Sequence, residues 1–202
     1  MAQDQSTRGE ARKAAEKVVE IVEPILDAKN LVLVNARFTN QGKRRILEVT
    51  IHRPKSTVSL EDCESVSREL DKKLDKLAKS KTGPIVDGAY VLQVQSPGID
   101  RKLKTLKELK VFVGERVEVE SSSPIDSLGV SFTGILEDAS EGRVTITQPK
   151  KVEIASGKKK RKKKKKESGV LTQFEEISLE LKSLSSVRLS PDNKSATDED
   201  SE

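Results

Sequence analysis

The 202-residue sequence contains one cysteine, one histidine, one tyrosine and no tryptophan. The single cysteine, Cys63, excludes an internal disulfide framework and is compatible with a reducing cytoplasm. No stretch approaches the roughly 18 apolar residues that a membrane-spanning helix needs. The polar segment 1–10 lacks the apolar region of a secretory signal. We therefore expect a cytoplasmic protein without a membrane anchor.

The scarcity of histidine and cysteine also limits the available chemistry. Serine and cysteine nucleophiles need a neighbouring base, and zinc sites generally need several His or Cys ligands. His52 ends a predicted strand and Cys63 lies on the apolar stripe of a predicted helix, so both are expected to be structural. The sequence contains no Walker-type or dinucleotide-type glycine loop. The sequence therefore predicts no catalytic residues, no metal and no cofactor. The alternative, an enzyme, would need titratable groups that come together in a pocket which the sequence does not reveal.

The sequence offers few aromatic side chains that could stack on nucleic-acid bases. It has four Phe and one Tyr, and proteins that read single-stranded bases usually use exposed aromatics. Tyr90, Phe112 and Phe132 stand where a hydrophobic core would need them. The sequence therefore does not predict specific base recognition.

Charge is strongly segregated along the chain. The net charge is +5, yet one segment holds nine consecutive basic residues. The end of the chain, 192–202, is acidic, and adjacent like charges repel, so we expect 156–168 and 192–202 to be disordered. The basic run could bind phosphate, or be an expendable insertion or an import signal. Its residues are Lys158, Lys159, Lys160, Arg161, Lys162, Lys163, Lys164, Lys165 and Lys166.

The first half of the chain alternates helical and strand patterns. Thr7 and Glu10 are spaced as a capping box, which predicts a helix over 8–28. Two β-type runs, 31–38 and 46–52, flank a Gly-containing turn and predict a hairpin.

A second helix and a third strand follow the hairpin. Ser59 and Asp62 predict the start of the helix, and 90–95 predicts the strand. The sequence thus favours a helix–hairpin–helix–strand layer domain. The expected buried face of the second helix comprises Leu60, Cys63, Val66, Leu70, Leu74 and Leu77.

The second half of the chain changes to a mainly β pattern. A short helix over 105–113 ends at Gly114, a favourable residue after a helix. Strands are predicted at 116–120, 130–136 and 143–147, with two more near the C-terminus. Segments 152–155 and 170–174 could pair as a hairpin that carries the basic run at its tip. Five short strands fit a small barrel that closes its own edges.

One segment resembles a known family. The run Tyr90-Val-Leu-Gln-Val-Gln-Ser-Pro-Gly-Ile-Asp-Arg101 is similar to the strand and SPG(I/L)DR signature of RimP, the bacterial ribosome maturation factor family. The run Val58-Ser-Leu-Glu-Asp-Cys-Glu-Ser-Val-Ser-Arg-Glu-Leu70 resembles the second helix of the same family. Lys102 departs from the proline that often follows the Asp-Arg pair in the family.

The resemblance implies an α+β chain: an N-terminal α/β domain over 1–100, an Sm/SH3-like barrel over 101–191 and an acidic tail over 192–202. It implies a monomeric, non-catalytic factor required for maturation of the small (30S) ribosomal subunit, binding the immature subunit through ribosomal RNA and a small-subunit ribosomal protein. The alternative is a general Sm-like RNA- or DNA-binding adaptor driven by the basic run. The expected inter-domain turn and contact residues are Ser96, Pro97, Gly98, Asp100 and Arg101.

Overall fold

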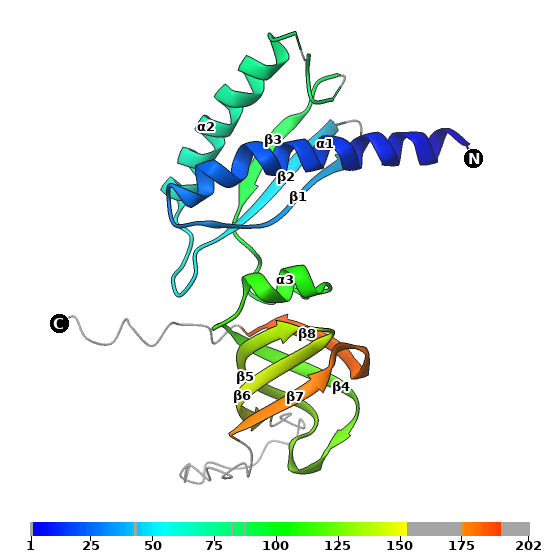
Figure 1. Ribbon diagram of the computed structural model, residues 1–202, viewed down its shortest axis with the longest axis vertical. Helices are drawn as coiled ribbons and strands as arrows, with labels where there is room; N and C mark the ends of the chain where they lie inside the picture. The colour runs from blue at the N-terminus through cyan, green and yellow to red at the C-terminus, as the bar shows by residue number, and fades with distance from the viewer. Residues whose placement is uncertain (1, 43, 82, 87, 153–174, 191–202) are drawn as a thin grey trace, which may run out of the picture. The chain divides into compact units, whose positions relative to one another are not determined.

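The structure, a computed structural model, describes residues 2–42, 44–81, 83–86, 88–152 and 175–190 (Figure 1). The basic run, the acidic tail and nearly all of the hairpin predicted over 152–155 and 170–174 lie outside these residues. The chain divides into two compact units, Met1–Gly98 and Ile99–Glu202. Each unit is described by itself.

The N-terminal unit is a three-stranded sheet with two helices on one face (Figure 1). Strands β1 and β2 form an antiparallel hairpin, and β3 runs parallel to β2, in the order β1-β2-β3. The predicted order of helix, hairpin, helix and strand is confirmed. The elements are α1 (Ala2–Asp27), β1 (Val32–Gln41), β2 (Arg44–His52), α2 (Leu60–Ala78) and β3 (Val91–Gln95).

The start of α1 differs from the prediction. The capping box at Thr7 and Glu10 is wrong, because the helix begins at Ala2 and both residues lie inside it. The residues before Thr7 include alanine and glutamine, which favour helices, so the helix continues through them. Pro24 also lies inside the helix, close to its end at Asp27.

The start of α2 agrees with the prediction. Ser59 Oγ accepts a hydrogen bond from the Asp62 N–H at 3.1 Å, and an Asp62 carboxylate oxygen accepts one from the Ser59 N–H at 3.1 Å. The predicted burial of Leu60 is wrong: this first helical residue is 80% exposed. Val58, which precedes the cap, packs against the core instead.

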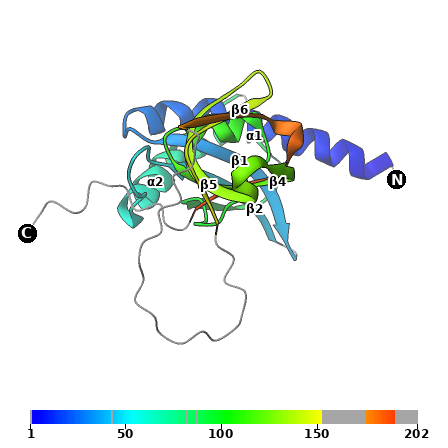
Figure 2. The same ribbon diagram turned by 90° about the horizontal axis from the view of Figure 1, so that it is seen from below.

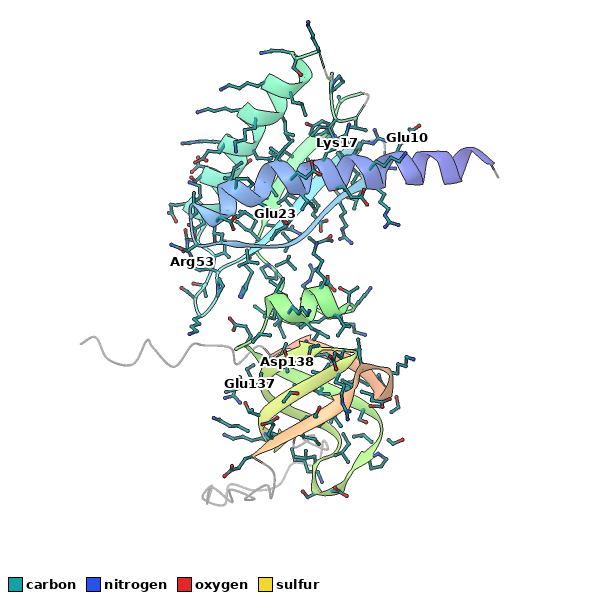
Figure 3. All side chains as sticks on the ribbon, in the orientation of Figure 1. Glu10, Lys17, Glu23, Arg53, Glu137 and Asp138 are labelled. Atoms are coloured by element: carbon teal, nitrogen blue, oxygen red, sulfur yellow. The ribbon has the colours of Figure 1, made fainter. Side chains whose placement is uncertain are left out.

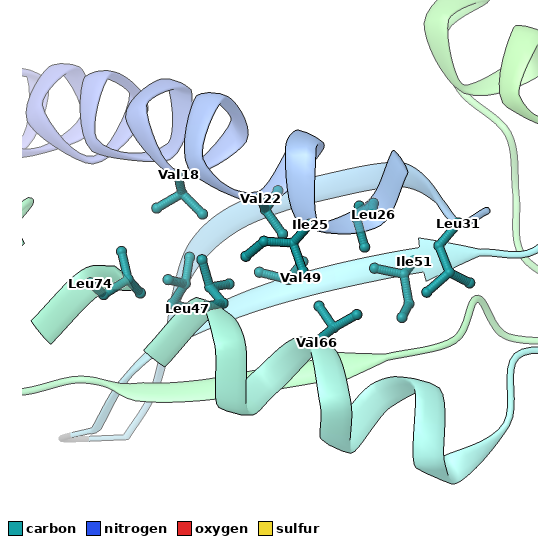
Figure 4. Close-up of a cluster of buried hydrophobic side chains, with 11 residues drawn as sticks. Val18, Val22, Ile25, Leu26, Leu31, Leu47, Val49, Ile51, Val66 and Leu74 are labelled. Atoms are coloured by element: carbon teal, nitrogen blue, oxygen red, sulfur yellow. The ribbon is translucent and has the colours of Figure 1, made fainter. Parts of the chain in front are cut away.

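The core of the N-terminal unit lies between the two helices and the sheet (Figure 4). Alternate residues of β2 contribute to it, because successive strand side chains point to opposite faces. Each fully buried aliphatic side chain contributes about 1.5–3 kcal/mol. The core comprises Val18, Val22, Ile25, Leu26, Leu31, Leu47, Val49, Ile51, Val66, Leu70 and Leu74.

The C-terminal unit is one short helix and a five-stranded antiparallel sheet in the order β7-β6-β5-β4-β8. The sheet is bent rather than flat (Figures 1 and 2). Phe112 and Phe132 are fully buried in this unit, as predicted. The elements are α3 (Leu106–Val111), β4 (Arg116–Ile125), η1 (Asp126–Leu128), β5 (Gly129–Ser140), β6 (Arg143–Lys151), β7 (Glu176–Glu180), η2 (Leu181–Ser183) and β8 (Leu184–Leu189).

The α+β class and five C-terminal strands are confirmed, but the closed barrel is not. Within the described residues β7 pairs only with β6, and β8 pairs with β4, so the sheet stays open between β7 and β8. The short 3-10 turn η2 separates these two strands and redirects the chain, so that they do not form a hairpin.

Candidate nucleic-acid interface

The SPG motif follows β3 and leads to the first residues of the C-terminal unit. Ser96, Gly98 and Asp100 are exposed, and Pro97 is half-buried. The neighbouring Ile99 is 74% exposed. The polar side chains of Ser96 and Asp100 are thus accessible to a partner. Arg101, which follows Asp100, is instead held in place.

Residues 101–103 lie along β8 as a short extended strap. The Leu103 N–H donates to the Val187 carbonyl at 2.8 Å, and the Leu189 N–H donates to the Arg101 carbonyl at 3.0 Å. Lys102 lies opposite Arg188 in this bridge. Because side chains alternate along an extended chain, Leu103 is buried at 4% exposure while the lysines on either side of it are exposed.

The strap explains how position 102 accepts a residue other than proline. The two hydrogen bonds to β8 use the carbonyl of Arg101 and the N–H of Leu103, and neither uses the N–H of Lys102. Proline has no N–H, and its presence at position 102 would therefore remove neither of these two hydrogen bonds. Lysine adds an exposed positive charge without altering these two hydrogen bonds.

Arg101 and Glu108 form an ion pair that fixes the strap to α3. Arg101 Nη2 lies 2.7 Å from Glu108 Oε1, and the two side chains are 20% and 15% exposed. Glu108 Oε2 accepts the Lys104 N–H at 2.9 Å, and the Glu108 N–H donates to Thr105 Oγ1 at 3.2 Å. Thr105 therefore caps α3, and Glu108 joins the cap, the helix and the strap.

The environment of Glu108 favours its ionised form. Burial alone would raise its pKa, but the hydrogen bonds from Arg101 and from the Lys104 and Thr105 backbone, with the Arg101 charge, lower the pKa below its ordinary value. Among the described residues, Arg101 Nε is buried without a hydrogen-bond partner. Arg101 is thus engaged mainly in holding α3, and its predicted role in phosphate binding stays a prediction.

The strap and α3 together expose four lysines, which we call the α3 basic surface: Lys102, Lys104, Lys107 and Lys110. Leu109, on the opposite side of α3, is fully buried, and α3 packs on β5. Lys107 and Lys110 stand three residues apart, so their side chains neighbour each other on the helix.

The α3 basic surface is not among the sites predicted from the sequence. The run 158–166 dominates the charge when it is summed over long segments, and this conceals smaller groups of lysines. The sequence pattern that could have predicted this surface is the spacing of its lysines around the buried Leu103 and Leu109. This spacing places the lysines on the solvent-exposed side of the strap and of α3.

The residues considered for catalysis occupy structural positions. His52 is 7% exposed at the end of β2. Burial, and then the nearby Asp62 charge, raises the pKa of the Cys63 thiol, which disfavours its nucleophilic form. Within the part of the chain that the structure describes, no three His, Cys, Asp or Glu side chains are grouped to hold a metal.

The aromatic side chains of the N-terminal unit contact each other rather than forming an exposed platform. The rings of Phe38 and Tyr90 meet edge to face with centroids 5.8 Å apart, and the Arg45 guanidinium carbon lies 5.9 Å from the Phe38 centroid. Burial raises the pKa of Tyr90, and the charges of Asp71 and Asp75 add to the shift. Among the helices described, none is long and apolar enough to cross a membrane.

An α/β layer unit followed by a small β unit with a basic surface defines a two-unit α+β protein. Residues 21–100 match the family model of the RimP N-terminal domain. This match covers the hairpin, α2, β3 and the SPG motif, which also carried the resemblance seen in the sequence. Residues 21–100 are thus similar to the N-terminal domain of RimP, a family of ribosome maturation factors.

Proposed function

We propose that this protein is a non-catalytic cytoplasmic factor required for maturation of the small (30S) ribosomal subunit. It binds the immature subunit through ribosomal RNA and a small-subunit ribosomal protein, without a cofactor. The similarity of residues 21–100 to the RimP N-terminal domain supports the maturation role. The α3 basic surface carries the RNA-binding part of the proposal, because it presents four exposed lysines on a rigidly held segment.

The α3 basic surface suits phosphate groups rather than bases. Lysine ammonium groups contact phosphate as point charges and carry little sequence information. The Arg101–Glu108 ion pair limits the motion of the backbone that carries these lysines, so less conformational freedom is lost on binding. Each phosphate contact releases counterions, which makes the affinity fall steeply with salt.

A binding factor can promote maturation without chemistry. A protein that binds one RNA conformation more tightly than another shifts the population toward the preferred conformation. Two units on one chain supply two contacts, and the first contact raises the effective concentration of the second. The proposal includes an Sm/SH3-like fold for the C-terminal unit, which is supported by its five-stranded antiparallel sheet and by the 3-10 turn before the last strand.

The alternative is a general polyanion-binding adaptor driven by Lys158–Lys166. The two functions differ in what the folded units contribute. An adaptor loses its binding to RNA or DNA when residues 158–166 are deleted. The proposed factor instead keeps a preference for immature subunits, because its folded units contribute to binding.

The test is co-sedimentation with immature small subunits, mature small subunits and bulk RNA at about 50 and 200 mM salt, where unspecific phosphate binding fades. The full chain is compared with a 158–166 deletion and with the double variant Lys107→Gln, Lys110→Gln. A matched control changes Lys13 and Lys17, exposed on α1, to Gln.

We expect the deletion to keep its preference for immature subunits at the higher salt. Each lysine of α3 that is neutralised should lower the slope of log affinity against log salt by about 0.7–0.9, and the α1 control should leave the slope unchanged. Equal binding to all RNAs, abolished by the deletion, would instead establish the adaptor.

A further inference from the structure

The α3 basic surface lies beside the point at which β8 leads into the last residues of the chain. The Leu189 N–H donates to the Arg101 carbonyl at 3.0 Å, and the Ser190 N–H donates to the Arg116 carbonyl at 3.0 Å. Ser190 is buried at 3% exposure, so the backbone is held in place up to this residue. The residues that follow Ser190 therefore start next to the strap that carries Lys102.

The acidic tail, 192–202, carries the opposite charge to the α3 basic surface. It contains five acidic residues and one lysine. Four of the acidic residues lie within 198–202, which we call the acidic cluster, so the cluster has as many charges as the surface has lysines. These four residues are Asp198, Glu199, Asp200 and Glu202.

The lysines of the α3 basic surface have no ionic partner in the described part of the chain. No ion pair there involves the side chain of any of the four. Glu108, the carboxylate of α3, is bound to Arg101 at 2.7 Å instead. Four exposed cations on one short segment repel one another, and an acidic segment placed over them would relieve this repulsion.

The acidic tail is long enough to reach all four lysines. At most three extended and five helical residues separate Lys102 from Lys110, so their Cα atoms lie within about 20 Å of each other. Counted from Ser190, the chain can span up to about 26 Å to Asp198 and about 40 Å to Glu202. The acidic cluster can therefore contact the whole surface while the chain stays attached at Ser190.

The basic run 158–166 is the other cationic segment that the acidic tail could contact, and position favours the α3 basic surface. The run connects β6 to β7, and β7 starts at the end of the C-terminal unit away from α3 (Figure 1). The end of β8 pairs with the strap instead. A segment tethered beside its site has an effective concentration of about 1 mM or more, and this concentration falls as the tether has to span further.

We propose that the acidic tail of this chain docks on the α3 basic surface and competes there with RNA phosphate. The carboxylates of the acidic cluster contact the four lysines that would otherwise contact phosphate. An RNA bound only through this surface has to displace the tail, whereas a ligand that also contacts another part of the protein keeps that contact. The docking stands on charge and position in this chain, and the competition rests on the proposed function.

The first experiment tests docking by NMR, through the backbone amide signals of residues 102–110 at about 50 and 500 mM salt. The full chain is compared with a chain that lacks 192–202, a deletion that removes none of the described residues. It is also compared with a neutral-cluster variant: Asp198→Asn, Glu199→Gln, Asp200→Asn and Glu202→Gln. A matched control removes four exposed carboxylates elsewhere in the same unit: Glu137→Gln, Glu141→Gln, Glu176→Gln and Glu180→Gln.

We expect the deletion and the neutral-cluster variant to shift the signals of 102–110 in the same way at the lower salt. The matched control should leave these signals where they are in the full chain. At the higher salt the differences should fade, because ions screen interactions between exposed charges.

The second experiment measures the affinity of the same proteins for small-subunit RNA freed of protein, each with and without residues 158–166. Removing the tail should tighten binding at the lower salt about threefold or more beyond the control, which corresponds to about two thirds of the molecules being docked. This gain should persist without 158–166. It should shrink in the Lys107→Gln, Lys110→Gln background, which lacks half of the docking charges.

Two results would overturn the inference while leaving the proposed function intact. One is that RNA binds but the signals of 102–110 are the same with and without the acidic tail. The other is that the gain in RNA affinity disappears without 158–166, because the tail would then cover the basic run. If the signals shift but no protein binds RNA, the docking stands, and the RNA contact of the proposed function fails together with the competition.

Discussion

Replacing Glu108 should destabilise the C-terminal unit more than replacing any exposed carboxylate in it. The Glu108 carboxylate accepts Arg101 Nη2 at 2.7 Å and the Lys104 N–H at 2.9 Å. A hydrogen bond to a charged group contributes about 1.5–3 kcal/mol. Glu108→Gln keeps the shape and one acceptor but removes the charge, so we expect the free energy of unfolding to fall by about 1–2 kcal/mol.

Glu108→Ala removes both hydrogen bonds. Breaking a fully buried ion pair costs about 3–5 kcal/mol. Because the Arg101 and Glu108 side chains are 20% and 15% exposed, water can solvate the remaining guanidinium in part. We therefore expect a decrease of about 2–3 kcal/mol, below the range for a fully buried pair.

The assay is denaturant unfolding of the full chain combined with hydrogen exchange over residues 101–110 and at Leu189. The amides of Leu103 and Leu189 should exchange faster in the alanine variant, because the ion pair no longer holds the strap on β8. Glu137→Ala is the control, since Glu137 is exposed on β5 (Figure 3). Equal stability and equal exchange in the Glu108→Ala and Glu137→Ala variants would refute the role of the ion pair.

Three further predictions concern stability. The hydrogen bond from Arg53 at 2.7 Å, and then the one from the Ser59 N–H, hold the pKa of the Asp62 carboxyl below its ordinary 3.8. This interaction therefore stabilises the fold above about pH 3.8, and the stabilisation is lost as the pH falls through the lower pKa of the folded state. Acid unfolding should consequently depend less steeply on pH in the Asp62→Asn variant. A Cβ on Gly134 would lie 2.3 Å from Ile146 Cγ2, so Gly134→Ala should cost about 1–3 kcal/mol, measured by denaturant unfolding; wild-type stability would contradict the packing. Leu70 is fully buried, so Leu70→Ala should cost about 2–5 kcal/mol, whereas Leu60→Ala should cost under about 0.5 kcal/mol.

The elements of the N-terminal unit could be predicted because local signals agree with the packing. Ser59 and Asp62 mark the start of α2 by a side-chain pattern that needs no distant contact. The start of α1 could not be placed in the same way. A Thr and a Glu at capping distance are also compatible with a helix interior, and the residues before Thr7 favour helix.

The position of Arg53 shows what the sequence could not reveal. Its Nη1 donates to the Lys29 carbonyl at 3.2 Å and its Nη2 to Asp62 at 2.7 Å. It thereby links the chain after α1 to the cap of α2 (Figure 3). In the sequence each of these residues resembles an ordinary exposed charge, and only the hairpin brings them together.

The same reason hid the candidate RNA-binding surface. Arg101 and Glu108 are seven residues apart. This spacing does not predict a contact along a helix, because Arg101 lies before the cap of α3 and Glu108 lies within the helix. The alternation of Lys102, Leu103 and Lys104 becomes informative once β8 is known to pair with this segment. That pairing joins parts of the chain that no local pattern connects.

The pairing of the strap with β8 also sets an order of events during synthesis. Domains fold from the N-terminus as the chain emerges, and all strands of the N-terminal sheet precede residue 96. By contrast, the Leu103 N–H donates a hydrogen bond to the Val187 carbonyl in β8, and β4 pairs with the same last strand. The lysines beside the strap therefore reach their final arrangement only after β8 has been made. In a chain truncated before residue 184, the strap would have no β8 to pair with, and its lysines would not be held in this arrangement. The α3 basic surface therefore forms only when translation has passed β8.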